Sequence, residues 1–316
     1  MSLAIVFPGQ GSQSVGMLAD LAGEWPQITD TFNAASEVLG YDLWALVQDG
    51  PENELNQTDK TQPAMLAAGI ATWRVWQAAG GAAPAYLAGH SLGEYSALVA
   101  AEALDFGDAI RLVERRGQLM QAAVPAGEGA MAAILGLDDA QVKDACERAA
   151  GDQTGQGEVV EPVNFNAPGQ VVIAGSKGAV ERAVTLAKEA GAKRAVMLPV
   201  SVPSHCRLMQ GAAAELALAL QEITIRAPRL PVIHNVDVAS HDDAEAIRAV
   251  LAKQLYSPVR WVETVQHLAQ AGVQTLVECG PGKVLAGLNK RIDRGMTAMP
   301  VFDPDSLAKA LEAPQA

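Results

Sequence analysis

The chain has 316 residues, of which 49% are hydrophobic and 19% charged, as in a compact protein with a large core. Its formal net charge of −13 argues against nucleic acid as a partner, so an acidic protein partner would need a local basic patch. No secretory signal and no apolar run of membrane-spanning length are evident. The three cysteines lie far apart and show no metal-ligand spacing. We therefore expect a cytoplasmic protein with no membrane partner, metal site or cofactor.

The beginning of the chain alternates between strand and helix patterns. Residues 3–7 are a short apolar run that predicts a buried strand, and the glycine-rich loop 8–13 follows it. Helices are predicted over residues 25–39, 61–80 and 105–123. Loops at the carboxyl ends of strands hold ligands in α/β proteins, so loop 8–13 is a candidate part of a site.

Residues 89–93, Gly-His-Ser-Leu-Gly, have the pattern of a nucleophile elbow. They lie between an apolar run at 85–88 and a helix-like segment at 92–101, as such a strand–turn–helix requires. The two glycines lack a Cβ and allow a sharp turn that exposes Ser91 at its tip. The backbone N–H of Leu92 would begin the next helix, where free donors favour an anion. The pattern predicts a nucleophile and one oxyanion donor, although it also occurs in ordinary turns.

Residues 125–199 predict a separate small domain. The expected elements are a strand at 129–136, a helix at 138–150, strands at 159–165 and 170–175, a helix at 176–190 and a strand at 193–199. This β-α-β-β-α-β order is that of a ferredoxin-like domain. We therefore predict an α/β protein in which residues 1–124 and 200–316 form the large domain.

The resumed large domain is also expected to alternate strands and helices. Its predicted strands cover residues 230–235, 274–278 and 297–301, the last at a sheet edge, and its predicted helices cover 244–254, 261–271 and 284–291.

A serine nucleophile needs a base, and there are five candidates: His90, His205, His234, His241 and His267. His205 is the favoured base, because it lies in a loop where the chain returns from the small domain. His234, at the end of a predicted strand, is the second candidate. The turn would direct His90 away from the serine. Between Ser91 and His205 no acid lies in a recognisable setting, so the chain does not show the Ser…Asp…His order of α/β-hydrolases. A backbone carbonyl could hold the imidazole instead.

The helix predicted at 105–123 carries three arginines, Arg111, Arg115 and Arg116. Three arginines on one helix usually mark a solvated face. One of them could instead be turned inward to meet a carboxylate.

Several motifs, taken together, resemble those of the malonyl-CoA:acyl-carrier-protein transacylases of type II fatty acid synthesis. The resemblance covers essentially the whole chain. The motifs lie at residues 7–13 (FPGQGSQ), 89–94 (GHSLGE), 116–117 (RG), 162–166 (PVNFN), 202–206 (VPSHC), 254–255 (QL) and 280–282 (GPG). Each motif alone is a weak signal, whereas all of them in this order are specific.

The resemblance implies an α/β-hydrolase-like domain with a ferredoxin-like insert, malonyl-CoA as donor and acyl carrier protein as partner. It identifies Ser91 as the acyl-accepting nucleophile and His205 as its base. Gln254 matches the residue whose backbone carbonyl holds the histidine. Malonyl would pass from coenzyme A to the serine, and then to the phosphopantetheine thiol of the carrier protein.

The remaining matches of this resemblance concern the oxyanion hole and the acyl group. Gln10 and Leu92 match the positions whose backbone N–H groups form the oxyanion hole. Arg116 matches the arginine that pairs with the malonyl carboxylate. Asn164 and Asn166 match polar residues lining the thioester channel.

Other functions stay open at this point. The same fold could serve a polyketide pathway or a malonyl-transferring subunit of a decarboxylase. A serine esterase or thioesterase is disfavoured by Arg116 and by the missing acid, and a non-catalytic binding subunit by the intact pair of Ser91 and His205.

Overall fold

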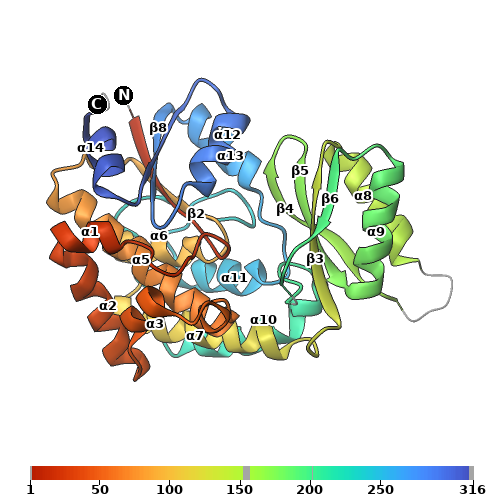
Figure 1. Ribbon diagram of the computed structural model, residues 1–316, viewed down its shortest axis with the longest axis horizontal. Helices are drawn as coiled ribbons and strands as arrows, with labels where there is room; N and C mark the ends of the chain where they lie inside the picture. Colours follow the sequence, from red (N-terminus) through yellow and green to blue (C-terminus); the bar gives the residue numbers. More distant parts are fainter. Residues whose placement is uncertain (1, 152–156, 201, 313–316) are drawn as a thin grey trace.

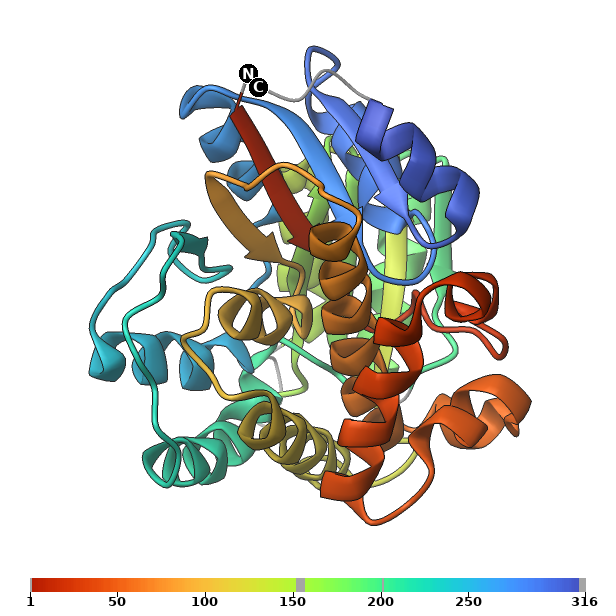
Figure 2. The ribbon, with the colours of Figure 1, turned by 90° about the vertical axis from the view of Figure 1, so that its left-hand side faces the viewer.

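The computed structural model describes residues 2–151, 157–200 and 202–312, which form two sheets of different kinds (Figure 1). The first sheet is parallel, with the strand order β7-β2-β1-β8-β9. Its strands are β1 (Ser2–Phe7), β2 (Tyr86–Gly89), β7 (Val232–Ile233), β8 (Val273–Cys279) and β9 (Thr297–Val301). Figure 2 shows β2, β1, β8 and β9 side by side. The strand predicted at 297–301 is thus confirmed as an edge strand.

Both faces of the parallel sheet are buried, as expected for this sheet type. Leu3, Ile5 and Phe7 of β1 join the core formed with α2 (Pro26–Leu39), α5 (Thr58–Ala78), α6 (Gly93–Ala100) and α7 (Phe106–Ala122). Ala4 and Val6 of β1 face the opposite side, toward α12 (Trp261–Gln270) and α13 (Val284–Ile292). The period-2 alternation of a strand accounts for this division. It also explains why the segment is an unbroken apolar run.

The remaining helices complete the large body. They are α1 (Ala19–Glu24), α3 (Leu43–Asp49), α4 (Glu52–Leu55), α10 (Gln210–Gln221), α11 (Ala244–Gln254), α14 (Pro304–Glu312) and the 3₁₀ turn Arg207–Met209. None of the helices in the described parts of the chain is long and apolar enough to cross a membrane.

The second sheet is antiparallel, with the strand order β4-β5-β3-β6. It consists of β3 (Gly129–Leu135), β4 (Val160–Ala167), β5 (Gln170–Ser176) and β6 (Arg194–Met197), with α8 (Asp139–Ala150) and α9 (Lys177–Glu189) between them in the chain. The predicted order β-α-β-β-α-β is therefore confirmed. The two helices cover one face, as Figure 1 shows. The other face packs against Cys206 and Leu208 of the large body.

A short backbone contact joins the two sheets. The N–H of Val259 donates to the carbonyl of Val163 at 2.8 Å, and the carbonyl of Val259 accepts from the N–H of Phe165 at 3.0 Å. This bridge ties β4 to the segment before α12. The ends of β1 and β2 and the inner face of the antiparallel sheet consequently face a common cavity.

Two features differ from the sequence-based expectation. The strand predicted at 230–235 is only two residues long, because Pro231 has no N–H and the residues after Ile233 turn to bind a buried carboxylate. The helices α1, α3, α4 and α14 were not predicted. The first two span six and seven residues, which is too short for helical periodicity to stand out.

Candidate active site

The turn between β2 and α6 is a nucleophile elbow. Ser91 occupies its tip with φ 52°, a left-handed conformation that is rare outside glycine. A Cβ on Gly89 would lie 1.9 Å from the carbonyl carbon of Gly93, and one on Gly93 would lie 2.1 Å from the oxygen of Phe7. Only glycine therefore fits at either position. The elbow predicted from the sequence is present.

Ser91 forms a hydrogen-bonded chain with His205 and Gln254. The serine Oγ lies 2.7 Å from His205 Nε2, and His205 Nδ1 lies 2.8 Å from the backbone oxygen of Gln254. Because a carbonyl can only accept, the proton belongs on Nδ1, and Nε2 is free to accept the serine proton. No acid takes part in this chain. The carbonyl fixes the imidazole tautomer, the role an aspartate has in a catalytic triad.

Burial is the main cause that lowers the pKa of His205 to about 3, and the nearby charge of Arg116 contributes. The imidazole is consequently neutral at neutral pH, as a general base must be before reaction. The backbone oxygen of Gln254 acts in the opposite direction, since it stabilises the protonated ring. That contact would stabilise an imidazolium if the ring accepted a proton.

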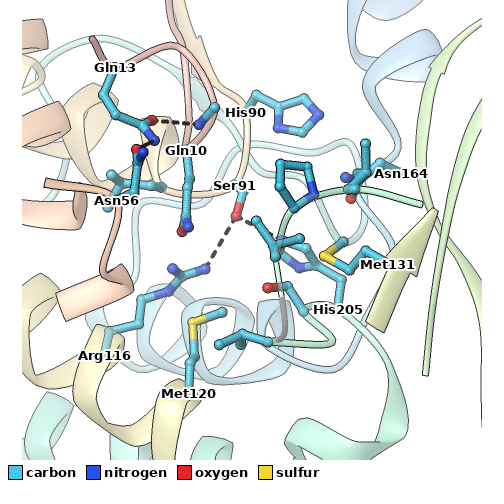
Figure 3. A pocket seen from close by; sticks show the side chains of 17 residues that line it. Gln10, Gln13, Asn56, His90, Ser91, Arg116, Met120, Met131, Asn164 and His205 are labelled. Atoms are coloured by element: carbon cyan, nitrogen blue, oxygen red, sulfur yellow. Dashed lines mark hydrogen bonds between the residues drawn. The ribbon is translucent and has the colours of Figure 1, made fainter. Parts of the chain in front are cut away.

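Arg116 points from α7 toward the same serine (Figure 3). Its side chain is 1% exposed, and Nη2 lies 3.3 Å from Ser91 Oγ. Nη1 donates to Gln62 Oε1 at 2.8 Å, and Nη2 donates to Gln254 Oε1 at 2.9 Å. No carboxylate of the described residues forms an ion pair with it. Nη2 also donates to Ser91 Oγ, so both of its hydrogens are engaged, whereas Nη1 keeps one hydrogen and Nε has no partner among the described residues. A carboxylate that takes the place of the Ser91 contact could therefore accept a bidentate pair.

The other two arginines of α7, Arg111 and Arg115, are exposed. Arg111 pairs with Asp108 on the same helix at 2.7 Å. Of the three alternatives left open by the helix pattern, the inward arginine is therefore Arg116.

Gln10 and Leu92, the two positions predicted for the oxyanion hole, both line the cavity that holds Ser91. Leu92 is the N-cap residue of α6. Neither backbone N–H takes part in the hydrogen bonds found within the described residues. Both are therefore available to an anion that forms beside Ser91.

The cavity has a volume of about 490 Å³ and is shared by the two bodies. The antiparallel sheet and the segment after it contribute Met131, Asn164 and Leu198. Asn166 lies behind the cavity wall, where its Oδ1 is 2.8 Å from Nε2 of His90. Of the two asparagines predicted to line the channel, only Asn164 does so here.

The second candidate base lies elsewhere. His234 is fully buried, and its Nδ1 lies 2.7 Å from Oε1 of Glu94, so it does not reach the serine. His241 pairs with Asp237. In residues 2–151, 157–200 and 202–312, no group of three or more His, Cys, Asp and Glu side chains could hold a metal ion.

Comparison with known proteins identifies the family. A model of the acyl transferase domain matches residues 4–300. The malonyl CoA-acyl carrier protein transacylase of Escherichia coli (strain K12) is 60% identical over 309 residues, with 98% of each chain covered. The chain belongs to the malonyl CoA-acyl carrier protein transacylase family. The transacylase of that name from Bacillus subtilis (strain 168) is 44% identical over 310 residues, which cover 98% of this chain and 96% of the relative.

Solved transacylase structures have the same fold. An acyl carrier protein S-malonyltransferase from Vibrio cholerae superposes with a TM-score of 0.94 at 62% identity, covering 98% of this chain and 99% of that one. A malonyl-transacylase solved in complex with a type II polyketide acyl-carrier protein gives a TM-score of 0.96 at 60% identity, with 99% of each chain covered. The mixed architecture, one parallel and one antiparallel sheet, is therefore that of the family.

This transacylase site contains polar residues that sequence reasoning missed. Gln62 of α5 holds Arg116, and Asn235 Oδ1 accepts from the backbone N–H of Ser91 at 2.7 Å. Gln62 directly follows the polar residues 58–61 at the start of α5, so its composition gave no signal that sets it apart. Asn235 is the last residue of the strand predicted at 230–235, 144 residues after the serine, and the pattern does not show that it reaches Ser91.

Proposed function

We propose that this protein moves a malonyl group from coenzyme A to the phosphopantetheine thiol of acyl carrier protein through a malonyl-Ser91 intermediate. The product supplies fatty acid elongation. The observation that carries the proposal is the buried guanidinium of Arg116, 3.3 Å from Ser91 Oγ. A receptor for a carboxylate that lies this close to the nucleophile fits a short dicarboxylic acyl group such as malonyl. An esterase that acts on uncharged acyl groups would not need such a carboxylate receptor.

In the first half-reaction, His205 Nε2 takes the proton from Ser91 as Oγ attacks the thioester carbonyl of malonyl-CoA. The carbonyl oxygen becomes an oxyanion, and the N–H groups of Gln10 and Leu92 donate to it. The carbon–sulfur bond then breaks, and the coenzyme A sulfur takes the proton from His205. Free coenzyme A and the malonyl-serine ester result.

The second half-reaction runs the same steps in reverse order with another thiol. The phosphopantetheine thiol gives its proton to His205 and attacks the ester carbonyl. The bond to Ser91 Oγ breaks, and Oγ recovers the proton from the imidazolium. Arg116 holds the malonyl carboxylate throughout. The positive charge of Arg116 lowers the pKa of His205, and pairing with the carboxylate weakens this influence.

We further propose that the fold is an α/β-hydrolase-like large domain, residues 1–124 and 200–316, with a ferredoxin-like small domain at 125–199. The strand order β4-β5-β3-β6 and the elbow after β2 support this division. Met131, Asn164 and Leu198 would then wall the cleft opposite the serine and restrict water, as a transferase requires. Free, buried cysteines at positions 146, 206 and 279 support a cytoplasmic location.

A transfer assay tests the proposed function. Malonyl-CoA and a phosphopantetheine-bearing acyl carrier protein, mixed with the protein, should give malonyl-carrier protein, and Ser91→Ala should abolish this product. Carrier protein that stays unloaded with the wild type would contradict the proposal.

A further inference from the structure

Glu94, in the first turn of α6, has a fully buried carboxylate. Neither of the two half-reactions described above assigns it a chemical step. Its oxygens accept three hydrogen bonds. Oε1 lies 2.7 Å from His234 Nδ1, and Oε2 accepts from the backbone N–H of Asn235 at 2.9 Å and from Gln254 Nε2 at 3.0 Å. One carboxylate thus contacts three residues that come from two distant segments of the chain.

The contact of Glu94 with Asn235 connects it indirectly to Ser91. While its backbone is held by Glu94, the side chain of Asn235 accepts from the N–H of Ser91 at 2.7 Å and donates to the carbonyl of Gly89 at 2.7 Å. These two bonds hold both sides of the elbow. They supply partners that stabilise the unfavourable positive φ of Ser91.

The contact of Glu94 with Gln254 connects it indirectly to both Ser91 and Arg116. Gln254 Nε2 also donates to the carbonyl of Ser91 at 3.0 Å, and Oε1 accepts from Arg116 Nη2 at 2.9 Å. Because Glu94 and the Ser91 carbonyl both accept, they require the NH₂ group on their side of the amide. The oxygen is thereby turned toward the guanidinium.

We propose that Glu94 is a positioning residue for acyl-group selectivity, which sets the spacing between Ser91 and Arg116 through Asn235 and Gln254. The proposal rests on the proposed function, in which Arg116 receives the malonyl carboxylate. If the guanidinium moves relative to Oγ, an acyl group held by its carboxylate no longer presents its carbonyl to the serine. An acetyl group has no carboxylate and does not depend on this spacing.

Two substitutions at Glu94 separate the effect of side-chain length from that of charge. Glu94→Gln keeps the length, and its oxygen can still accept from Asn235 and Gln254. Its NH₂ group can donate to Nδ1 of His234 in the other tautomer, since Nε2 of that ring has no partner among the described residues. Glu94→Asp keeps the charge and shortens the side chain by one methylene. A positioning role therefore predicts that the aspartate, and not the glutamine, is harmful.

The test is the rate of single-turnover loading of Ser91 by malonyl-CoA and by acetyl-CoA, followed by intact mass. We expect Glu94→Asp to lower the malonyl-to-acetyl rate ratio about 10-fold or more, as a small misplacement of reacting groups does. Glu94→Gln should keep at least the wild-type ratio. The matched control is Glu278→Asp, because Glu278 is equally buried but accepts from the N–H groups of Leu285 and Ala286 in α13. It should leave the ratio unchanged, even if the free energy of unfolding falls.

Two results would overturn the proposal. One is a wild-type ratio in folded Glu94→Asp, and the other is a loss in Glu94→Gln at least as large as that in Glu94→Asp, because the length of the side chain would then not explain the ratio. If Glu94→Asp does not fold, Gln254→Met replaces it, because this change keeps the backbone oxygen on His205 and removes the amide. An unchanged ratio in Gln254→Met overturns the proposal too. A wild type that forms no malonyl adduct would instead refute the proposed function.

Discussion

Arg116 and Ser91 meet inside the protein, with Nη2 3.3 Å from Oγ and the arginine 1% exposed. Burying a cation without a direct counter-ion costs several kcal/mol. The amide oxygens of Gln62 and Gln254 offset part of this cost and fix the plane of the guanidinium. These contacts hold a buried cation beside Ser91 Oγ.

Removal of Arg116 should change acyl selectivity. We expect Arg116→Ala to lower the rate of malonyl loading about 100-fold or more, because losing one partner of a buried charge pair costs roughly 3 kcal/mol. Acetyl loading should fall far less. Arg116→Lys should lie between, since lysine keeps the charge and loses the planar fork. Loading rates from both thioesters, measured by rapid quench, give the comparison.

The control for this series is Arg111→Ala, on the exposed face of the same helix, which should load malonyl like the wild type. Parallel losses of malonyl and acetyl loading in Arg116→Ala would show that the arginine does not bind the carboxylate.

A backbone role for Gln10 predicts an unusual pair of variants. Gln10→Ala keeps the N–H and loses only a long side-chain contact to Thr58 Oγ1 at 3.4 Å, so its loading rate should stay close to the wild type. Gln10→Pro removes the N–H and should cost about 100-fold or more in kcat, as the loss of one oxyanion donor does. Steady-state kinetics with malonyl-CoA distinguish the two. A strong loss in Gln10→Ala would assign the role to the side chain instead.

The elbow glycines should be intolerant of any side chain. In Gly89→Ala the new Cβ would lie 1.9 Å from Gly93 carbon, so the backbone must shift, and we expect a loss of about 3 kcal/mol or more in the free energy of unfolding. Gly287→Ala in α13 is the matched control. Its Cβ would meet nothing within 4 Å, so it should gain roughly 0.5–1 kcal/mol. Denaturant titrations of both variants test this, and similar stabilities would refute the steric argument.

The lowered pKa of His205, about 3, has consequences for both activity and stability. The base stays neutral as the pH falls through 6.5, so the single-turnover loading rate should stay flat from pH 8 to about pH 5. The unfolded chain, by contrast, gains a proton on this residue below about pH 6.5. Because the unfolded state then binds more protons, stability falls with decreasing pH in this window, by up to about 1.4 kcal/mol per pH unit.

The His205→Gln variant should lose this contribution to the pH dependence of unfolding. A loading rate that halves near pH 6.5 in the wild type would show that the imidazole titrates like an exposed histidine.

The local parts of the site could be predicted from the sequence, and the long-range contacts could not. The elbow was predictable because five neighbouring residues specify it. The inward direction of Arg116 depends on Gln62 and Gln254, which lie 54 and 138 positions away in the chain. Helical periodicity alone left three arginines as alternatives, and only the family resemblance singled one out.

In the fold, too, local features could be predicted from the sequence and long-range contacts could not. The order of strands and helices followed from apolar runs and turn residues, whereas the pairing of β1 with both β2 and β8 is a tertiary property. Residues 230–235 were predicted as a longer strand, which extended the apolar residues 230–233 to the polar pair His234 and Asn235. Two hydrogen bonds to the buried carboxylate of Glu94 end the strand early. A sequence pattern cannot reveal such a competing partner.

Intact mass of the protein mixed with malonyl-CoA, without any acceptor thiol, tests the central claim most directly. A malonyl-Ser91 ester is expected to accumulate, to persist in water and to discharge when the phosphopantetheine-bearing carrier protein is added. The Ser91→Ala variant should show no adduct. Steady release of free malonate with no accumulated ester would instead show a hydrolase, and would contradict the account given for Ser91, His205 and Arg116.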